Sequence, residues 1–157
     1  MESDAVFRKA LSAAYLFLAR RSHSQEELKA KLLRKGFAPT VTAQALEAIA
    51  RQGFTNDEQV SLQWALNLVE KRCWGRHKVS AYLLRKGIAR ELVDRVQKQI
   101  WQEFDESTVA RAALKKQYAR SKDRPSVEKM ARFLKSRGFT QEAIYRNLDI
   151  NSIRAGE

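Results

Sequence analysis

Residues 32–37 read Leu-Leu-Arg-Lys-Gly-Phe, residues 83–88 read Leu-Leu-Arg-Lys-Gly-Ile, and residues 134–139 read Leu-Lys-Ser-Arg-Gly-Phe. The glycines of the three stretches lie 51 residues apart, at Gly36, Gly87 and Gly138. A fixed spacing of this kind marks tandem repeats, in which each unit buries its apolar face against its neighbours. Three such units occupy nearly all of the 157 residues. We therefore expect the repeats themselves to carry the function, and we expect one continuous core to run through them.

Apolar residues around these stretches recur with the spacing of amphipathic helices. The first unit has such a pattern at Leu11, Ala14, Tyr15 and Leu18. The same pattern returns 51 residues later, at Leu62, Ala65, Leu66 and Val69. A second helix is expected to end at each repeated glycine, because glycine tolerates the positive φ common after a helix. No segment alternates with the period of a strand, so the sequence predicts an all-α fold of about nine helices.

The pattern predicts three modules of three helices each, with limits at residues 1–54, 55–104 and 105–157. Stacked in order, they should form an elongated, curved repeat body. The last helix of the third module is expected to differ from its counterparts. Asn147 and Asn151 stand where the other modules have apolar residues, so we expect this helix to be short and frayed.

The composition favours a polyanionic partner. Lys and Arg number 30 against 18 Asp and Glu, which gives a net charge of +12, and such an excess attracts nucleic acid or an acidic protein surface. Cys73 is the only cysteine, so an intrachain disulfide is excluded. No apolar run reaches the length of a membrane span, and the N-terminal residues lack the features of a signal peptide. We expect a cytoplasmic protein without a membrane partner.

Catalytic groups are scarce in this sequence. His23, His77 and Cys73 match no nucleophile, phosphate-loop or metal-binding motif, and two neighbouring ligands are too few for a zinc site. The acidic pairs at residues 26–27 and 57–58 lie in predicted first helical turns, where the helix dipole favours negative charge. We therefore expect no enzymatic activity, no cofactor and no metal, and we interpret Cys73 as a small buried residue.

Basic residues gather in the second and third modules, with Trp74 and His77 among them. Such a mixture can stack on bases and neutralise phosphates. Trp74 can alternatively seal the small core beneath its turn, which is the interpretation we favour. The predicted partner-binding surface consists of these residues: Arg72, Arg76, Lys78, Arg85, Lys86, Arg120, Lys122, Arg124, Lys129, Arg132 and Lys135.

Leu33 and Leu84 lie about 140° away from the core-facing side of their own helices. Two interpretations stay open. Both leucines can pack against the adjoining module, or they can form an apolar contact with a partner protein.

The chain resembles the RecX family of bacterial regulators in its three helix triplets and in several short motifs. Besides the repeated glycine stretches, these are residues 25–28 (Gln-Glu-Glu-Leu), 53–57 (Gly-Phe-Thr-Asn-Asp) and 72–75 (Arg-Cys-Trp-Gly). Each motif is short, and their order and spacing along nearly the whole chain carry the resemblance.

This resemblance implies a regulator that binds the RecA recombinase in its nucleoprotein filament. It implies that the curved body lies in the helical groove of the filament. There it would inhibit ATP hydrolysis, strand exchange and co-protease activity, either by blocking extension or by promoting disassembly. Implied roles are in DNA repair, homologous recombination and the SOS response. The expected partners are the RecA filament and single-stranded DNA, with double-stranded DNA as a second candidate, and the expected state is a monomer.

Two other classes of function fit the residues. The first is an autonomous DNA-binding protein built from helix-turn-helix-like repeats, which would bind DNA tightly without RecA. The second is a helical scaffold for an acidic protein, which would bind its partner after nuclease treatment and without RecA.

Overall fold

Helices follow one another in three triplets through the described part of the chain. The computed structural model describes the backbone of residues 1–153 and the side chains of residues 1–148. The first triplet is α1 (Glu2–Arg20), α2 (Gln25–Arg34) and α3 (Pro39–Arg51). The second is α4 (Asp57–Glu70), α5 (Arg76–Arg85) and α6 (Arg90–Glu103), and the third is α7 (Glu106–Tyr118), α8 (Val127–Ser136) and α9 (Gln141–Ile153). With nine helices and no strand in these residues, the all-α prediction is confirmed.

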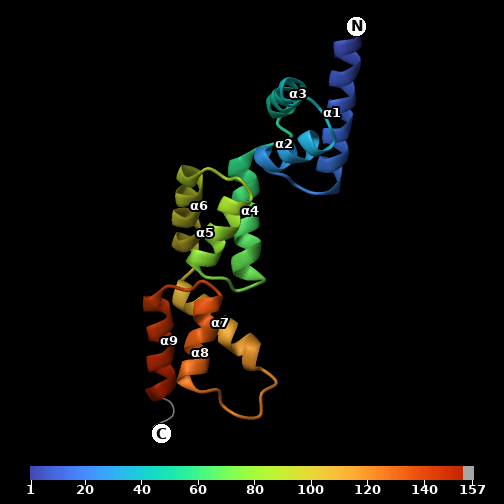
Figure 1. Ribbon diagram of the computed structural model, residues 1–157. Coiled ribbons are helices and arrows are strands. Elements are labelled where there is room, and N and C mark those ends of the chain that lie inside the picture. Colours follow the sequence, from blue (N-terminus) through green and yellow to red (C-terminus); the bar gives the residue numbers. More distant parts are fainter. Residues whose placement is uncertain (154–157) are drawn as a thin grey trace.

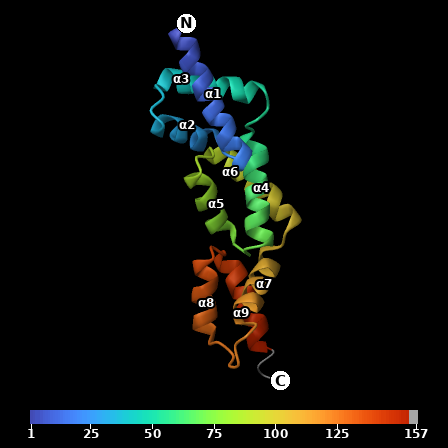
Figure 2. The same cartoon turned by 90° about the vertical axis from the view of Figure 1, so that its right-hand side faces the viewer.

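The triplets lie one after another along a bent line, with the two termini at opposite ends (Figures 1 and 2). The helix pairs in close contact lie within one triplet, as α1 with α3, α4 with α6, and α7 with α9. This arrangement confirms the elongated, curved repeat body. The predicted module limits, after residues 54 and 104, fall between α3 and α4 and between α6 and α7, and they stay a prediction.

The expectation of a short last helix is wrong. Helix α9 has 13 residues, the same number as α3. Its Asn147 is buried and donates hydrogen bonds from Nδ2 to the carbonyl oxygens of Ser107, at 3.0 Å, and Ala143, at 2.8 Å. A buried amide with these acceptors links α9 to α7 and does not interrupt the helix. The side chain of Asn151 and residues 154–157 lie outside the described residues.

The apolar core is divided, which corrects the expectation of one continuous core. One cluster of the described residues lies inside the first triplet, around Leu28, Leu32 and Ile49. A second cluster extends through the second and third triplets and includes both Leu83 and Leu134. The first junction is therefore held mainly by polar contacts, whereas the second combines polar contacts with shared apolar packing.

Polar groups at the start of α2 hold the first junction. Ser24 caps α2 by accepting from the amide of Glu27 at 3.1 Å, and its hydroxyl donates to the carbonyl of Lys86 at 2.6 Å. Asp57, the first residue of α4, accepts from the amide of Gln25 at 3.0 Å. Glu27 forms an ion pair with Lys86 at 3.4 Å. Helix α2 thus docks on the turn that carries Gly87.

The second junction repeats this construction one module later. The amide of Gly75 donates to the carbonyl of Arg137 at 2.8 Å, and the amide of His77 donates to that of Gly138 at 2.9 Å. Glu106, the first residue of α7, accepts from the amide of Arg76 at 3.2 Å. In both junctions the second helix of one module docks on the glycine turn of the next. The residues that begin α2 and α5 and the glycine turns that they contact keep the 51-residue spacing of the sequence repeat, whereas the carboxylates of Asp57 and Glu106 come from helix starts with a different offset.

His23 beside the first junction makes stability depend on pH. It is 1% exposed, and its Nδ1 lies 2.9 Å from the carbonyl oxygen of Arg21, so that nitrogen donates. Nε2 then accepts from Lys31 Nζ at 2.7 Å. Burial lowers the pKa of His23 below its ordinary 6.5, and the nearby charges of Arg21 and Lys31 lower it further against the opposing effects of the Arg21 carbonyl and Glu27. The folded state thus binds the proton less readily than the unfolded state.

We expect the free energy of unfolding to fall as the pH drops below 6.5 towards the folded-state pKa of His23. Well above pH 6.5, His23 is neutral in both states and should not affect the free energy of unfolding. Urea unfolding at about pH 7.5 and about pH 5.5 measures this difference. His23→Gln should abolish most of it, whereas His77→Gln, at the exposed histidine, should leave it unchanged. A His23→Gln protein with the full pH dependence would show that other groups cause it.

Candidate nucleic-acid interface

A basic cleft lies where the second triplet meets the third. Its volume is about 300 Å³, and it is lined by residues from the end of α4, the turn before α5, α7 and α8. These residues are Lys71, Arg72, Cys73, Trp74, Ala113, Lys116, Gln117, Phe133 and Arg137. The second junction creates the cleft, because it brings the turn before α5 against the turn after α8.

Trp74 forms one wall of this cleft and is itself part of the core. Its side chain belongs to the shared apolar cluster, and the residue is 7% exposed. It packs edge-on against Tyr82, with ring centroids 6.0 Å apart. The structure supports the favoured interpretation that Trp74 seals the core, because so little of the ring is open to a stacking base. Cys73 beside it is also buried, as predicted.

Cations surround the ring of Trp74. Lys78 Nζ lies 4.3 Å from the ring centroid and Arg72 Cζ lies 5.7 Å from it. Arg137 lies over Phe133 on the other wall, with its Cζ 5.2 Å from the ring centroid. These aromatic faces attract the cations and hold them in position without neutralising their charge.

The charge of this group is not balanced by carboxylates. No Asp or Glu is among the described residues lining the cleft, and no ion pair joins a described carboxylate to Arg72, Lys78 or Arg137. Burial lowers the pKa of Lys78, and the charges of Arg137, Arg72 and Arg85 lower it further. A bound anion would relieve the repulsion within the group, so Arg72, Lys78 and Arg137 form a candidate phosphate site, named here the junction cluster.

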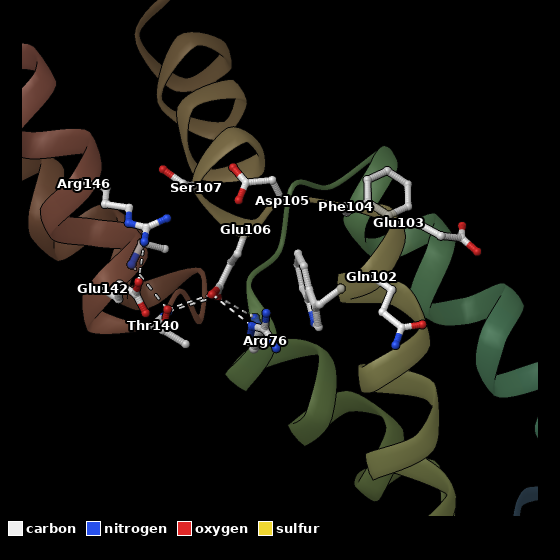
Figure 3. Close-up of a pocket in the computed structure, with 12 residues that line it drawn as sticks. Arg76, Gln102, Glu103, Phe104, Asp105, Glu106, Ser107, Thr140, Glu142 and Arg146 are labelled. Carbon is white, nitrogen blue, oxygen red and sulfur yellow. Dashed lines mark hydrogen bonds and ion pairs between the residues drawn. The ribbon is translucent and has the colours of Figure 1, made fainter.

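Two of the predicted site residues hold the junctions together. Arg76 donates from Nε to Glu106 at 3.2 Å, and Thr140 donates from its hydroxyl to the same carboxylate at 2.7 Å. Figure 3 shows Glu106 between these partners beside a pocket of about 390 Å³. Lys86 is paired with Glu27 across the first junction. Arg76 and Lys86 therefore have structural partners in addition to any external one.

The other predicted residues are spread over the second and third triplets. Arg85 lies near enough to Lys78 to lower its pKa. Arg120, Lys122 and Arg124 lie in the connection between α7 and α8, and Lys129, Arg132 and Lys135 lie on α8. All six side chains are exposed. The structure thus joins two of the eleven predicted residues, Arg72 and Lys78, in the junction cluster and leaves the others outside it.

Arg137 belongs to the junction cluster but was not among the residues predicted from the sequence. It stands 51 residues after Lys86, in the repeated glycine stretch, so its place in the turn could have been predicted. Its proximity to Lys78 could not, because that depends on the docking of α5 against Gly138. Leu33 and Leu84, the leucines predicted to point away from the core of their own helices, have different environments. Leu84 packs against the shared core, whereas Leu33 is 38% exposed.

Comparison with known proteins identifies relatives of this chain along most of its length. The family model described as "RecX, first three-helix domain" matches residues 10–47. A regulatory protein RecX of Halorhodospira halophila is 30% identical over 145 residues, covering 91% of this chain and 88% of the relative. That of Pelodictyon phaeoclathratiforme is 29% identical over 138 residues, covering 86% of this chain and 84% of the relative.

Solved structures share the fold. A crystal structure of a regulatory protein RecX superposes with a TM-score of 0.81 at 17% identity, covering 94% of this chain and 74% of that one. RecX from Lactobacillus salivarius superposes with a TM-score of 0.78 at 16% identity, covering 94% of this chain and 99% of that one. Within the described residues, no helix is long and apolar enough to cross a membrane, and no group of metal-binding side chains is present.

Proposed function

This chain belongs to the RecX family of regulatory proteins, and from that membership we propose that it binds the RecA filament on single-stranded DNA and inhibits it. The observation that carries the proposal is the 30% identity to a regulatory protein RecX over 88% of that protein's length. Inhibition would extend to ATP hydrolysis, strand exchange and co-protease activity, through blocked extension or promoted disassembly.

The junction cluster supports the nucleic-acid part of this proposal. Arg72 and Arg137 line the cleft and Lys78 lies over the ring of Trp74, and no described carboxylate lining the cleft or ion-paired to these cations balances their charge. A phosphate of the filament's DNA would replace the repulsion between these cations with attraction and release counterions from the DNA. Buried Trp74 and half-buried Phe133 behind them make the group a fixed feature of the junction.

The shape supports the filament as partner. A body of three stacked triplets presents a long surface that can contact neighbouring subunits of a polymer at once (Figure 1). Its net charge of +12 draws it towards an acidic surface that carries DNA. Charge supplies attraction and association rate, while the contacts along the body supply specificity.

RecA-driven ATP hydrolysis on single-stranded DNA tests the proposal. We expect the rate to fall progressively when the protein is added at less than one molecule per RecA, because one bound body affects several subunits. An unchanged rate at a molar excess would contradict regulation of RecA. Arg120, Arg124 and Arg132 are exposed. Changing all three to Glu should therefore weaken inhibition while leaving the helical circular dichroism spectrum unchanged.

Binding to bare DNA separates this proposal from an autonomous DNA-binding function. A protein that makes about six phosphate contacts to a single strand has a log–log salt slope near −4. We expect weaker binding to bare single strands than to the RecA filament under the same salt. Equal affinities for both would favour the autonomous function.

A further inference from the structure

A groove between α8 and α9 has a composition different from that of the junction cluster. Its volume is about 560 Å³. Its lining is Ala131, Arg132 and Lys135 from α8, Gly138 and Phe139 from the turn, Gln141, Ile144, Tyr145 and Leu148 from α9, and His77 from α5. The four α9 residues are spaced as one face of a helix, so α9 presents a continuous strip to the groove.

The floor of the groove is apolar and its edges are cationic. Phe139, Ile144 and Leu148 are at most 8% exposed, whereas the Tyr145 side chain stands out at 56%. Arg132 and Lys135 are exposed, and no carboxylate among the described residues forms an ion pair with either. Among the side chains that the structure describes, through residue 148, no Asp or Glu lines the groove.

The second module closes the equivalent position with polar groups. Gln97 stands where Leu148 does, and Ser80 stands where Ala131 does, each 51 residues earlier. Gln97 donates from Nε2 to the hydroxyl of Ser80 and to the carbonyl oxygen of Arg76, both at 2.8 Å. Asp94 takes the place of Tyr145. The apolar groove with cationic edges in the third module is thus not repeated in the second.

We propose that this groove docks an acidic amphipathic helix of a partner protein, which on the proposed function belongs to the filament. Apolar side chains at every third or fourth position of that helix would cover Tyr145 and the floor, and its flanking carboxylates would pair with Arg132 and Lys135. A nucleic-acid strand fits less well, because the floor of Phe139, Ile144 and Leu148 offers phosphates no partner and, of the rings in the lining, only that of Tyr145 is exposed for a base to stack on. A second copy of this chain fits less well, because the net charge of +12 repels it.

The direct test uses a synthetic helical peptide with leucine at every third or fourth position and glutamate along both flanks. The full chain should bind it saturably, as measured by fluorescence anisotropy of a labelled peptide. The double variant Tyr145→Ala, Lys135→Glu should weaken binding by about tenfold or more. Lys98→Glu on α6, at an exposed cation, serves as the matched control and should bind normally. Equal binding of a peptide with lysine in place of glutamate would overturn the proposal.

Two further measurements compare the affinity of the same variant for the RecA filament and for bare DNA. The Tyr145→Ala, Lys135→Glu variant should lose about tenfold in affinity for the RecA filament and keep its affinity for an oligothymidylate. Equal losses of affinity for the filament and for the oligothymidylate would show that the groove binds nucleic acid. If the unchanged protein is a dimer and the variant is a monomer, the groove binds a second copy of this chain. Either result overturns the proposal. If the unchanged chain does not bind the RecA filament but binds the acidic peptide, the proposed function fails and the groove proposal stands.

Discussion

Gly138→Ala is expected to lower the free energy of unfolding by roughly 3 kcal/mol, as the sum of a backbone cost and a steric cost. The backbone cost arises because Gly138 has φ +82°, where a side chain is strained. The steric cost arises because an added Cβ would lie 2.3 Å from the backbone nitrogen of Lys78 and 2.4 Å from its Cβ. Since α5 contributes the backbone atom, the second and third triplets must move apart.

Gly36→Ala is the matched control, because it carries the backbone cost alone. Gly36 has φ +94°, and an added Cβ there would meet nothing within 4 Å. We expect a loss of about 1 kcal/mol. Urea unfolding followed by circular dichroism measures both variants, and their difference reports the junction contact. Equal losses at Gly36 and Gly138 would show that the docking of α5 on the turn does not contribute to stability.

The helices could be predicted from the sequence because each signal was repeated. The apolar spacing of residues 11–18 returns at residues 62–69, and each second helix ends before a glycine of positive φ. Local capping was also predictable: Ser24 accepts from the amide of Glu27, as a serine before an acidic first turn indicates. These features depend on residues close together in the chain, so periodicity and propensity suffice to identify them.

The junctions could not be predicted, because their contacts join residues far apart in the chain. Asp57 and Glu106 begin helices, where a carboxylate is explained by the helix dipole alone. In the structure each also accepts from the amide that begins the second helix of the preceding triplet. The division of the core follows from the same contacts, because polar groups of α2 fill the first junction. No sequence pattern distinguishes a carboxylate with one role from a carboxylate with two.

The candidate site could be predicted only in part, because some of its residues are neighbours in the sequence and one is brought in by a long-range contact. Arg72 and Lys78 were identified because they flank Trp74 in the sequence. Arg137 was missed, since it reaches the cluster only through the close approach of Gly138 to Lys78. The remaining predicted cations lie on exposed helix faces and in the α7–α8 connection, where charge alone gives no signal of shared position.

Neutralising the junction cluster is expected to reduce affinity for single-stranded DNA by about 100-fold at about 0.1 M salt. The triple variant is Arg72→Gln, Lys78→Gln, Arg137→Gln. Each lost phosphate contact lowers the magnitude of the log–log salt slope by about 0.7, so the three together should lower it by about 2. Inhibition of RecA-driven ATP hydrolysis should weaken in parallel if the same cleft meets the DNA of the filament.

The variant should remain folded, and this separates a binding role from a structural one. Burial lowers the pKa of Lys78 in the folded protein, and repulsion from Arg137 and Arg72 lowers it further. Removing the three charges relieves that repulsion but also removes their attraction to the rings of Trp74 and Phe133, so we expect the free energy of unfolding to change little. The matched control, Arg90→Gln, Arg95→Gln, Lys98→Gln, removes three exposed charges from α6. Salt slopes that fall equally in both variants would mean that net charge, and not the cluster, binds the DNA.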